Sequence, residues 1–425
     1  MKLNRYKDIL AIKTETGKVV GFHSRNLQVA HLDEPVWAAL SSEALPEGEV
    51  GDEIQAWNSE VDPNATDFDL PQAVRSLAIN IAQVCNLKCT YCAAGGDGSY
   101  GDPMKDADLD TLYEQIRMLL HDVPAGEAFS IRFFGGEPLV VPQAVKSIAR
   151  FAKLQVAGRG IDLRFSLTTN GTLVTPEIAR MLASFNCHVT VSIDGPPEVN
   201  DISRPTASGR GSSKLVLRGL ENLRAVRHEL GSLAAGAVFG KHHQGVLATY
   251  KFLQPFDLDT IKFDFAAEDG DAEASQNYSR ELMATADEAF RSGGEAELRR
   301  INLFDMYFSA LDRQKRSHNH CGAGKSHLQV DTRGRMSVCQ WWVNLPEEEI
   351  GRGLQIDHQK LEHYRDRLVD LNDCGGCWAR HLCGGGCMFV NRVKNGDKHK
   401  KDNEYCSRTR NTIAKAVELY AEARV

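Results

Sequence analysis

Residues 76–92 read SLAINIAQVCNLKCTYC, an apolar run followed at once by three cysteines. The run SLAINIA predicts a strand. Cys85, Cys89 and Cys92 then form a C-x3-C-x2-C pattern on the loop that follows it. Thiolates are ligands for iron and zinc, so the sequence places a candidate metal site directly after a strand.

The same order of strand and polar loop recurs from about residue 75 onward. Further strand candidates are FSIRFFG, DLRFSLTTN, HVTVSIDG, LAAGAVFG and TIKFDFA, with helical segments such as LDTLYEQIRMLLHDV and PEIARMLASF between them. This alternation predicts a parallel sheet, either a barrel or a doubly wound sheet. Functional residues collect at the carboxyl ends of such strands, where GGEP, TTNG and SIDG also stand.

The composition narrows the class of protein. A chain of 425 residues predicts two or three domains. The net charge of −7 argues against nucleic acid as the main partner. No apolar run has the roughly 18–20 residues of a membrane span, and the N-terminal MKLNRYKDIL lacks the apolar core of a signal peptide. We therefore expect a cytoplasmic protein without a membrane partner.

Eleven cysteines are unusual in such a chain. Secreted disulfide scaffolds are shorter and denser in cysteine, so clustered cysteines here favour metal binding or redox chemistry. Cys187 stands alone in a likely strand and reads as a small buried hydrophobe. Besides the early triad, seven cysteines lie late in the chain: Cys321, Cys339, Cys374, Cys377, Cys383, Cys387 and Cys406.

Two readings of the early triad follow from its residues alone. Three thiolates can hold three irons of a [4Fe–4S] cluster and leave the fourth iron open to an amine and a carboxylate. A zinc site is the alternative, but structural zinc usually takes four ligands in closely spaced pairs. No fourth ligand stands near the triad in the sequence.

The triad spacing, Tyr91 before its last cysteine and GGEP at 135–138 together resemble the radical S-adenosylmethionine superfamily. The resemblance implies that S-adenosylmethionine binds the open iron and that Tyr91 borders the adenine. Gly135 and Gly136 would let the backbone approach the methionine amino group, to which Glu137 supplies charge. An electron from the cluster would then cleave S-adenosylmethionine and give a 5′-deoxyadenosyl radical that abstracts a hydrogen atom.

The resemblance also implies contacts to the ribose or the carboxylate of S-adenosylmethionine. Ser192 of SIDG and Arg204 of SRP are the candidates for these contacts. Asn170 and Asp194 are further candidates for cofactor binding, and turn formation after a strand is the alternative role of both.

The late cysteines follow the pattern C-x12-G-x4-C, a gap, C-x2-C-x5-C-x3-C, a gap and C. This pattern resembles the SPASM extension of radical S-adenosylmethionine enzymes, which implies two auxiliary [4Fe–4S] clusters and three clusters in all. Some relatives have another cysteine soon after the first, where this chain reads CGAGKSH, so one iron would be open or bound by water, His327 or another group. A zinc-ribbon-like domain is the alternative. The resemblance assigns Cys321, Cys339 and Cys387 to the first auxiliary cluster and Cys374, Cys377, Cys383 and Cys406 to the second.

These observations predict an α/β protein with three parts. Residues 1–60, with three short strands and a helix after Asp33, form a small α+β domain of the winged-helix, leader-binding kind. Residues 46–72 read as a linker. Residues 75–300 form a partial (β/α)6 TIM-like barrel. Residues 315–425 form the Cys-rich SPASM domain, with a closing helix over 408–424.

SPASM proteins mostly modify peptides or proteins. The segments YCAAGGDGSYGDPM and SIDGPPEVNDISRPTASGRGSS resemble the matching stretches of maturases that cross-link ribosomal peptides. The resemblance implies a precursor peptide with a leader as substrate, and a thioether, carbon–carbon or carbon–oxygen cross-link as product. A leader could add a strand to a sheet edge of residues 1–60, although simple packing is an alternative role of this domain. An electron donor such as flavodoxin or ferredoxin is the second expected partner.

The sulfatase-maturing branch is the main competing family. In that branch an aspartate just after the second late cysteine is the base, whereas this chain has Gln340, which cannot take a proton. Two residues are candidates for the catalytic site. Gln340 occupies the position of that base, and Asp264 is a candidate for the base itself. Because side chains alternate along a strand, Asp264 points opposite to Phe263 and is expected to face the barrel interior. Glu268, Asp331 and His327 are other possible bases. A small-molecule enzyme of the same fold and a non-catalytic electron carrier are further alternatives.

Overall fold

The computed structural model describes residues 2–42, 45–71, 73–92, 107–268, 270–342 and 345–424. The chain divides into two compact units. The barrel unit contains Leu70–Asp271 and Gly322–Asp366, and the terminal unit contains Met1–Asp69, Ala272–Cys321 and Arg367–Val425. This division by packing does not follow the predicted segments 1–60, 75–300 and 315–425, whose separate roles stay a prediction.

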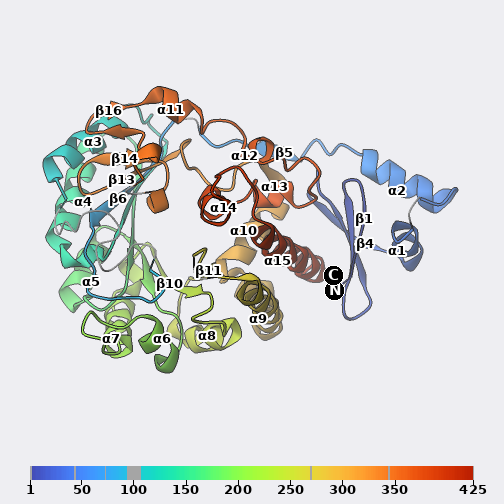
Figure 1. The fold of residues 1–425 in the computed structure, drawn as a ribbon, viewed down its shortest axis with the longest axis horizontal. Helices are drawn as coiled ribbons and strands as arrows, with labels where there is room; N and C mark the ends of the chain where they lie inside the picture. The colour runs from blue at the N-terminus through green and yellow to red at the C-terminus, as the bar shows by residue number, and fades with distance from the viewer. Residues whose placement is uncertain are drawn as a thin grey trace. The chain divides into compact units, whose positions relative to one another are not determined.

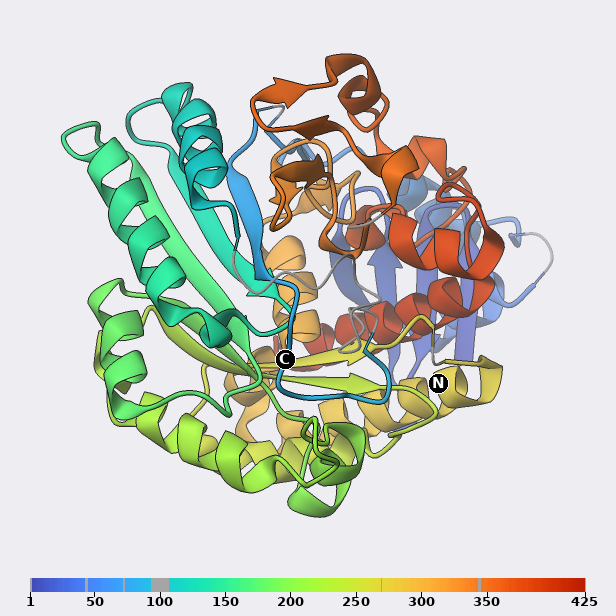
Figure 2. The same cartoon turned by 60° about the vertical axis from the view of Figure 1, so that its left-hand side comes forward.

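Strands β6 to β11 of the barrel unit run parallel in sequence order, each paired with the next. Helices lie between them in the chain and cover the outer face of the curved sheet (Figure 2). The predicted α/β fold with a partial barrel is therefore confirmed. The strands are β6 (Ser76–Ala82), β7 (Ala128–Gly135), β8 (Asp162–Thr169), β9 (His188–Ser192), β10 (Ser232–Phe239) and β11 (Thr260–Phe265), and the helices are α3 (Leu109–His121), α4 (Pro142–Val156), α5 (Pro176–Ser184), α6 (Pro197–Ser203), α7 (Ser213–Arg224) and α8 (Val246–Leu253).

The alternation of side chains along each strand separates the two faces of this sheet. On β11, Ile261 and Phe263 are buried on the outer face, whereas Lys262 and Asp264 lie on the opposite, inner face. Burial of the outer apolar rows against the helices supplies the hydrophobic stabilisation of this unit. Polar side chains on the inner face are left to contact ligands.

The barrel sheet continues beyond β6 with strands from the late part of the chain. β13 (His327–Val330) pairs with β6 in parallel, and β14 (Arg335–Ser337), β15 (Gly351–Arg352) and β16 (Gln355–Ile356) follow antiparallel. The buried side-chain amide of Gln115 on α3 donates hydrogen bonds to the carbonyls of Gly334 and Gly353, and these bonds hold the turns of the added strands against α3. The sequence analysis did not foresee it, because strands of two to four residues show no periodicity.

The terminal unit begins with an antiparallel sheet in the order β1-β2-β3-β4. The sequence predicted the last three strands but missed β1, whose polar residues lie on an exposed edge. Helices α1 and α2 pack on this sheet through a core that contains Ile9, Leu40 and Ile54. The strands and helices are β1 (Lys2–Tyr6), β2 (Ile9–Lys13), β3 (Val19–His23), β4 (Gln28–Leu32), α1 (Glu34–Leu40) and α2 (Glu49–Ser59).

The expected linker over residues 46–72 is wrong for most of its length. It contains α2, in which Val50, Ile54 and Trp57 share one apolar face, and strand β5 (Thr66–Phe68). β5 pairs in parallel with β12 (Lys315–Ser317). This helix is hard to recognise in the sequence because most of its residues are acidic or polar, and its few apolar residues lie on one face.

Long helices complete the terminal unit. The predicted closing helix is α15 (Asn403–Glu422), which Asp402 caps by accepting a 2.7 Å hydrogen bond from the amide of Tyr405. In Figure 1 it lies beside the N-terminal sheet, whose β3 and β4 it contacts. The other helices of this unit are α9 (Ala272–Arg299), kinked at Gly293 and Gly294, α10 (Asn302–Asp312), α12 (Leu368–Leu371), α13 (Arg380–Cys383) and α14 (Met388–Asn395), while α11 (His358–Glu362) belongs to the barrel unit.

Among the described residues, no helix has the length and apolar content that crossing a bilayer requires.

Candidate active site and cluster-binding cysteines

The early triad lies on the loop that leaves the carboxyl end of β6. The segment after α6 holds this loop through its backbone: Lys88 N donates to Pro205 O at 2.8 Å, and Thr90 N donates to Ser203 O at 3.0 Å. Leu87 also forms a bridge with Thr206. The three cysteines are partly buried and free of disulfides. Residues 93–106, which include most of the Gly-rich segment after the triad, lie outside the described residues.

Gly135 and Gly136 bring the end of β7 against the start of the triad loop. A Cβ atom on Gly136 would lie 2.3 Å from the carbonyl oxygen of Val84, and one on Gly135 would lie 2.3 Å from that of Ala82. Gly135 also has a φ of +136°. The sequence analysis assigned the two glycines to close approach of S-adenosylmethionine. The structure adds a different close approach, to the backbone that leads into Cys85.

Glu137 is fully enclosed and bridges two strand ends. Its carboxylate accepts hydrogen bonds from the amide of Leu139 at 3.0 Å, the hydroxyl of Thr169 at 2.7 Å and the amide of Asn170 at 2.7 Å. Burial raises its pKa to about 7, although these three donors oppose the shift. The carboxylate therefore joins the GGEP loop to the TTNG loop, a contact that the motif itself does not reveal.

Asn170 links the TTNG loop to the triad. Its side-chain amide donates to Asn86 Oδ1 at 2.9 Å and lies 3.7 Å from Cys85 Sγ. Its Oδ1 accepts from the amide and the hydroxyl of Thr172. Asn170 thus both forms a turn and contacts the cysteine loop, so the two roles considered for it are not exclusive.

A buried polar network surrounds Cys89. The hydroxyl of Tyr91 donates to the carboxylate of Asp194 at 2.8 Å, and Arg204 Nε lies 3.1 Å from the same carboxylate. Arg204 Nη1 lies 3.8 Å from Cys89 Sγ, and its guanidinium stands over the Tyr91 ring. Burial raises the pKa of Cys89, which the Arg204 charge opposes. Arg204 therefore favours a thiolate at the position of a predicted cluster ligand.

The same network accounts for Asp194, which is fully buried. Besides Tyr91 and Arg204, its carboxylate accepts a 3.1 Å hydrogen bond from the amide of Val238 on β10. Its own amide donates to Asn200. Asp194 therefore holds the triad loop, β10 and Arg204 together. Tyr91 also stacks on His242 with ring centroids 4.2 Å apart, a contact that the sequence analysis missed.

The inner face of the sheet carries Ser192, Gly236 and Lys262 in one row across β9, β10 and β11. Lys262 Nζ reaches across the small Gly236 and donates to the hydroxyl of Thr190 at 3.0 Å. Asp264 follows Lys262 on this face. Its exposed surface faces the inside of the curved sheet, and this enclosure raises its pKa while the charge of Lys262 lowers it.

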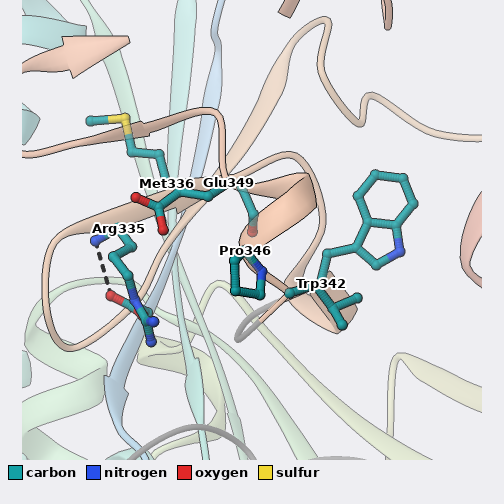
Figure 3. A pocket seen from close by; sticks show the side chains of 8 residues that line it. Arg335, Met336, Trp342, Pro346 and Glu349 are labelled. Carbon is teal, nitrogen blue, oxygen red and sulfur yellow. Dashed lines mark hydrogen bonds and ion pairs between the residues drawn. The ribbon is translucent and has the colours of Figure 1, made fainter. Parts of the chain in front are cut away.

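The other predicted base candidates differ in their surroundings. Burial and the charge of Arg132 lower the pKa of His327 to about 4, so its imidazole is neutral and weakly basic at pH 7. Asp331 is buried and pairs with Arg335 at 2.6 Å (Figure 3). Glu268 is exposed after β11. Gln340 begins a short 3-10 helix, Gln340–Trp342.

Asp331 also lines the small cavity of Figure 3, together with Arg335, Met336 and Trp342. Its volume of about 20 Å³ is enough for roughly one water molecule. The hydrogen bonds that Asp331 accepts from the amides of Arg333 and Arg335 shape the turn before β14. Asp331 is therefore a structural residue of the sheet extension and a poor candidate for the base.

Four of the late cysteines gather in the terminal unit. Burial, and next the charges of Cys406, Cys377 and Cys374, raise the pKa of Cys383 to about 12, so these three thiols lie near enough to Cys383 to affect its ionisation. Cys387 and Cys321 are a second pair in this unit, since Cys321 contributes to the raised pKa of Cys387. Cys339 belongs to the barrel unit. Cys187 is 2 % exposed, which confirms its predicted burial.

The N-terminal sheet holds the loop that carries Cys374 and Cys377. Arg5 Nη1 donates to Gly376 O at 2.7 Å, and Arg380 donates to both Cys377 O at 3.0 Å and Asp8 at 2.9 Å. Trp378 packs edge-on against Phe22 of β3. Peptide recognition and simple packing were the two predicted roles of residues 1–60, and the sequence gives no signal for these contacts, which join chain segments more than 350 residues apart.

The donor set fits iron–sulfur clusters better than a single metal ion. Within the described residues, no group of three or more His, Cys, Asp or Glu side chains converges as binding of one ion requires. A [4Fe–4S] cluster places each thiolate on a different iron, so its ligands need not converge on one point. The cysteines are free of disulfides, and those of the early triad and those around Cys383 lie near enough to raise one another's pKa, which matches this requirement.

Comparison with known proteins agrees with the geometry. Residues 79–252 match the model of the radical SAM superfamily. A serine-type anaerobic sulfatase-maturating enzyme of Klebsiella aerogenes is 25 % identical over 354 residues, which cover 79 % of this chain and 84 % of that protein. A mycofactocin maturase of Mycobacterium ulcerans is 24 % identical over 331 residues, which cover 73 % and 82 % of the two chains.

Two solved structures share the fold. Native anSMEcpe with bound AdoMet superposes with a TM-score of 0.68 at 21 % identity, over 82 % of this chain and 99 % of that chain. SuiB of Streptococcus suis, bound to precursor peptide SuiA, gives a TM-score of 0.52 at 13 % identity, over 95 % and 100 %. The chain therefore contains a radical SAM domain and is homologous to anaerobic sulfatase-maturating enzymes and a mycofactocin maturase. It is an enzyme of the oxidoreductase type, in a superfamily that uses S-adenosylmethionine and a [4Fe–4S] cluster.

Proposed function

We propose that this enzyme modifies a peptide or protein by abstracting a hydrogen atom from it, and that the substrate is a ribosomal precursor peptide that receives an intramolecular cross-link. The observation that carries the proposal is the arrangement around Cys89 on the radical SAM domain. There Arg204, held by Asp194, stands 3.8 Å from a thiol of the triad at the rim of the parallel strands. Named relatives that mature sulfatases and mycofactocin support a peptide or protein substrate.

Cys85, Cys89 and Cys92 would hold the catalytic cluster, and S-adenosylmethionine would bind against Tyr91, Ser192 and Arg204. Bound together, the two groups supply the radical that removes hydrogen from the substrate. The residues of the chain orient them: Asp194 fixes Arg204 and Tyr91, and Asn170 supports the loop at Cys85. Gly135, Gly136 and Glu137 hold the adjacent strand ends in register.

Two auxiliary clusters of the SPASM kind would be bound in addition. The gathering of Cys374, Cys377, Cys383 and Cys406 in the terminal unit supports one of them. The proximity of Cys321 and Cys387 supports part of the other, to which Cys339 would contribute. The open position of that cluster has no assigned ligand. His327 is a poor choice, since it accepts or donates a 3.1 Å hydrogen bond with Ser76 on the inner face of the barrel.

Asp264 is the proposed base for the step that follows hydrogen abstraction. It stands on the inner face of the last barrel strand, and its raised pKa moves a carboxylate toward the range that suits proton transfer near neutral pH. Lys262 on the same strand favours its ionised form. Gln340, which is not basic, is proposed only as a contact to the substrate.

Oxidation of one side chain, as in the sulfatase maturases, is the second candidate. The match to two such enzymes over 79 % of this chain favours it, whereas Gln340 in place of an acidic residue disfavours it. A leader peptide would add to an edge of the β1–β4 sheet, and flavodoxin or ferredoxin would supply electrons. The cytoplasmic location stays a prediction from the sequence.

The test uses the anaerobically reconstituted full chain with dithionite, S-adenosylmethionine and synthetic peptides encoded beside its gene. We expect 5′-deoxyadenosine, and a peptide that loses two hydrogen atoms and resists fragmentation between two linked residues. A new carbonyl that reacts with a hydrazine probe would instead select the second candidate. Absence of 5′-deoxyadenosine from an enzyme with full iron content would contradict both.

A further inference from the structure

A positively charged surface covers the outer side of the early cysteine loop. Lys88 lies within that loop, between Cys85 and Cys89, and its side chain is exposed. Residues 202–220, which run beside the loop and into α7, contain no aspartate or glutamate. Arg210, Lys214 and Arg218 of this segment are exposed as well. We call Lys88, Arg210, Lys214 and Arg218 the cationic face.

Backbone contacts hold the cysteine loop against the segment that carries Arg210 and leads into α7. Lys88 N donates to Pro205 O, and the amide of Ala207 donates to Asn86 O. The amide of Ser213, next to Lys214, donates to Asp201 at 2.7 Å. Figure 1 shows the loop after β6 running along the edge at which α6 and α7 lie, and Figure 2 agrees.

The charges of this face are not neutralised within the described part of the chain. No side chain of its four members forms an ion pair or a hydrogen bond there. The carboxylate of Asp201 accepts a hydrogen bond from the Ser213 amide, and Glu221, which lines a hollow with Lys214 and Arg218, is the one acid at the edge of the cationic face among the described residues. Four cations that have no side-chain partner among the described residues, on a chain of net charge −7, are a local reversal of the sign of the charge. Such a reversal selects acidic partners and accelerates their association.

Apolar side chains accompany the cations. Ile202 on α6 is 72 % exposed, next to Ser203, which accepts the hydrogen bond from the loop amide of Thr90. Leu215, Leu217 and Phe256 line a hollow of about 470 Å³, together with three cations, Lys214, Arg218 and Arg224, and one acid, Glu221. An exposed apolar residue and an apolar hollow with a charged rim are typical of a protein-docking surface.

We propose that the cationic face docks a small acidic electron-carrier protein, which passes one electron through the adjacent loop to the group held by Cys85, Cys89 and Cys92. In this step the carrier is oxidised by one electron and the cluster is reduced by one. The inference rests on the proposed function, which requires that this cluster be reduced. It goes further by naming the surface at which the electron enters.

A second basic segment provides the natural comparison. Lys394 in the last turn of α14 and Lys400 between α14 and α15 are exposed in the terminal unit, in the stretch that precedes Cys406. The nearby Lys401 opposes the burial-raised pKa of Cys374, so this segment lies beside the late cysteines. Entry of electrons through an auxiliary cluster would make this segment, rather than the cationic face, the docking surface.

The experiment compares two charge-reversal variants of the iron-loaded full chain: Arg210→Glu/Lys214→Glu/Arg218→Glu, and the control Lys394→Glu/Lys400→Glu. Each is reduced either by an acidic flavodoxin or by dithionite. For the first variant at low salt, we expect flavodoxin-supported formation of 5′-deoxyadenosine to fall about tenfold or more. The dithionite-supported rate should stay at the wild-type level, and the control should match wild type with both reductants.

Binding of oxidised flavodoxin, measured by titration calorimetry, gives a readout that needs no turnover. We expect the first variant to bind about tenfold more weakly and to lose most of the salt dependence seen with wild type. Equal affinity of wild type and the first variant, or a loss confined to the control, would overturn the proposal. Failure of the wild type with dithionite would instead count against the proposed function and leave the binding result readable.

Discussion

Arg204 Nε lies 3.1 Å from the carboxylate of Asp194, and both side chains are buried. Arg204 also lies beside Cys89, with its Nη1 3.8 Å from the sulfur. A buried charge without its partner is strongly unfavourable, so Asp194 determines whether Arg204 can stay beside the cysteine loop. This pair connects the stability of the barrel rim to the chemistry of the triad.

Asp194→Asn should therefore affect both stability and cofactor binding. We expect a loss of roughly 3 kcal/mol in the free energy of unfolding, because the Arg204 charge stays buried without its counter-charge. Binding of S-adenosylmethionine should weaken about tenfold or more. Urea unfolding and equilibrium dialysis measure the two effects. Glu198→Gln, at an exposed position on α6, is the control, and an equal effect of both changes would refute the role of Asp194.

Gly136→Ala tests the close approach of β7 to the cysteine loop. The added Cβ would lie 2.3 Å from Val84 O and 3.2 Å from the amide nitrogen of Cys85, so the loop must move. We expect the variant to fold but to bind about four irons fewer than wild type, as loss of one [4Fe–4S] cluster implies. Gly245→Ala, whose Cβ would meet only ordinary contacts at 3.6 Å, should keep full iron content. Full iron binding by the Gly136 variant would show that the loop tolerates displacement.

Glu137 should make the stability of the barrel fall with rising pH. Its pKa is raised by burial from the ordinary 4.5 to about 7, so the folded protein holds a proton that the unfolded chain has lost between these values. The contribution is fully present below pH 4.5 and is lost as the pH rises through about 7. By linkage it amounts to roughly 3 kcal/mol.

The measurement is urea unfolding of the metal-free chain at pH 5 and at pH 7.5, in wild type and Glu137→Gln. The variant should lack this part of the pH dependence. It should also be less stable at pH 5, because one amide oxygen cannot satisfy the three donors that Glu137 binds. An identical pH profile in both proteins would show that Glu137 does not titrate in this range.

Asp8 should show the opposite pH dependence in the terminal unit. Partial burial would raise its pKa, but hydrogen bonds from Arg25 and Arg380 outweigh burial and hold the pKa well below its usual range. Asp8 thus stabilises the fold above about pH 4, and this contribution is lost as the pH falls further. Asp8→Asn should cost roughly 2 kcal/mol at pH 7, and this cost should shrink progressively as the pH falls below about 4.

The same variant should loosen the loop around Cys377, to whose carbonyl Arg380 donates. We expect faster loss of iron to a chelator from the late cysteines, with the early cluster unaffected. Asp33→Asn is the control, because Asp33 precedes α1 without a side-chain cap contact. Equal rates of iron loss in the two variants would show that Asp8 and the N-terminal sheet do not affect how firmly the late cysteines hold iron.

The strands of the barrel could be predicted almost to the residue, because each is an apolar run that ends in a polar motif. Tyr91 and Arg204 were assigned from the family resemblance, whereas the positions of Asn170 and Asp194 at one rim followed from the same pattern. Their partners did not, since alternation tells which face a residue occupies but not which distant side chain it meets. The Asp194–Arg204 pair and the three donors of Glu137 are of this kind.

Other features left no readable pattern in the sequence. β1 is polar because it is an exposed edge, and β14 to β16 are too short for periodicity. The contact of Arg5 with Gly376 joins opposite ends of the chain. Such long-range contacts depend on tertiary packing, so local propensity cannot reveal them.

The most direct test of a catalytic cluster with two auxiliary clusters is anaerobic iron and sulfide quantification with electron paramagnetic resonance. It compares wild type with Cys85→Ala/Cys89→Ala/Cys92→Ala. We predict about twelve irons per chain in wild type and about eight in the variant, which should form no 5′-deoxyadenosine. Zinc in place of iron, or about four irons in wild type and none in the variant, would contradict the assignment of the late cysteines to clusters.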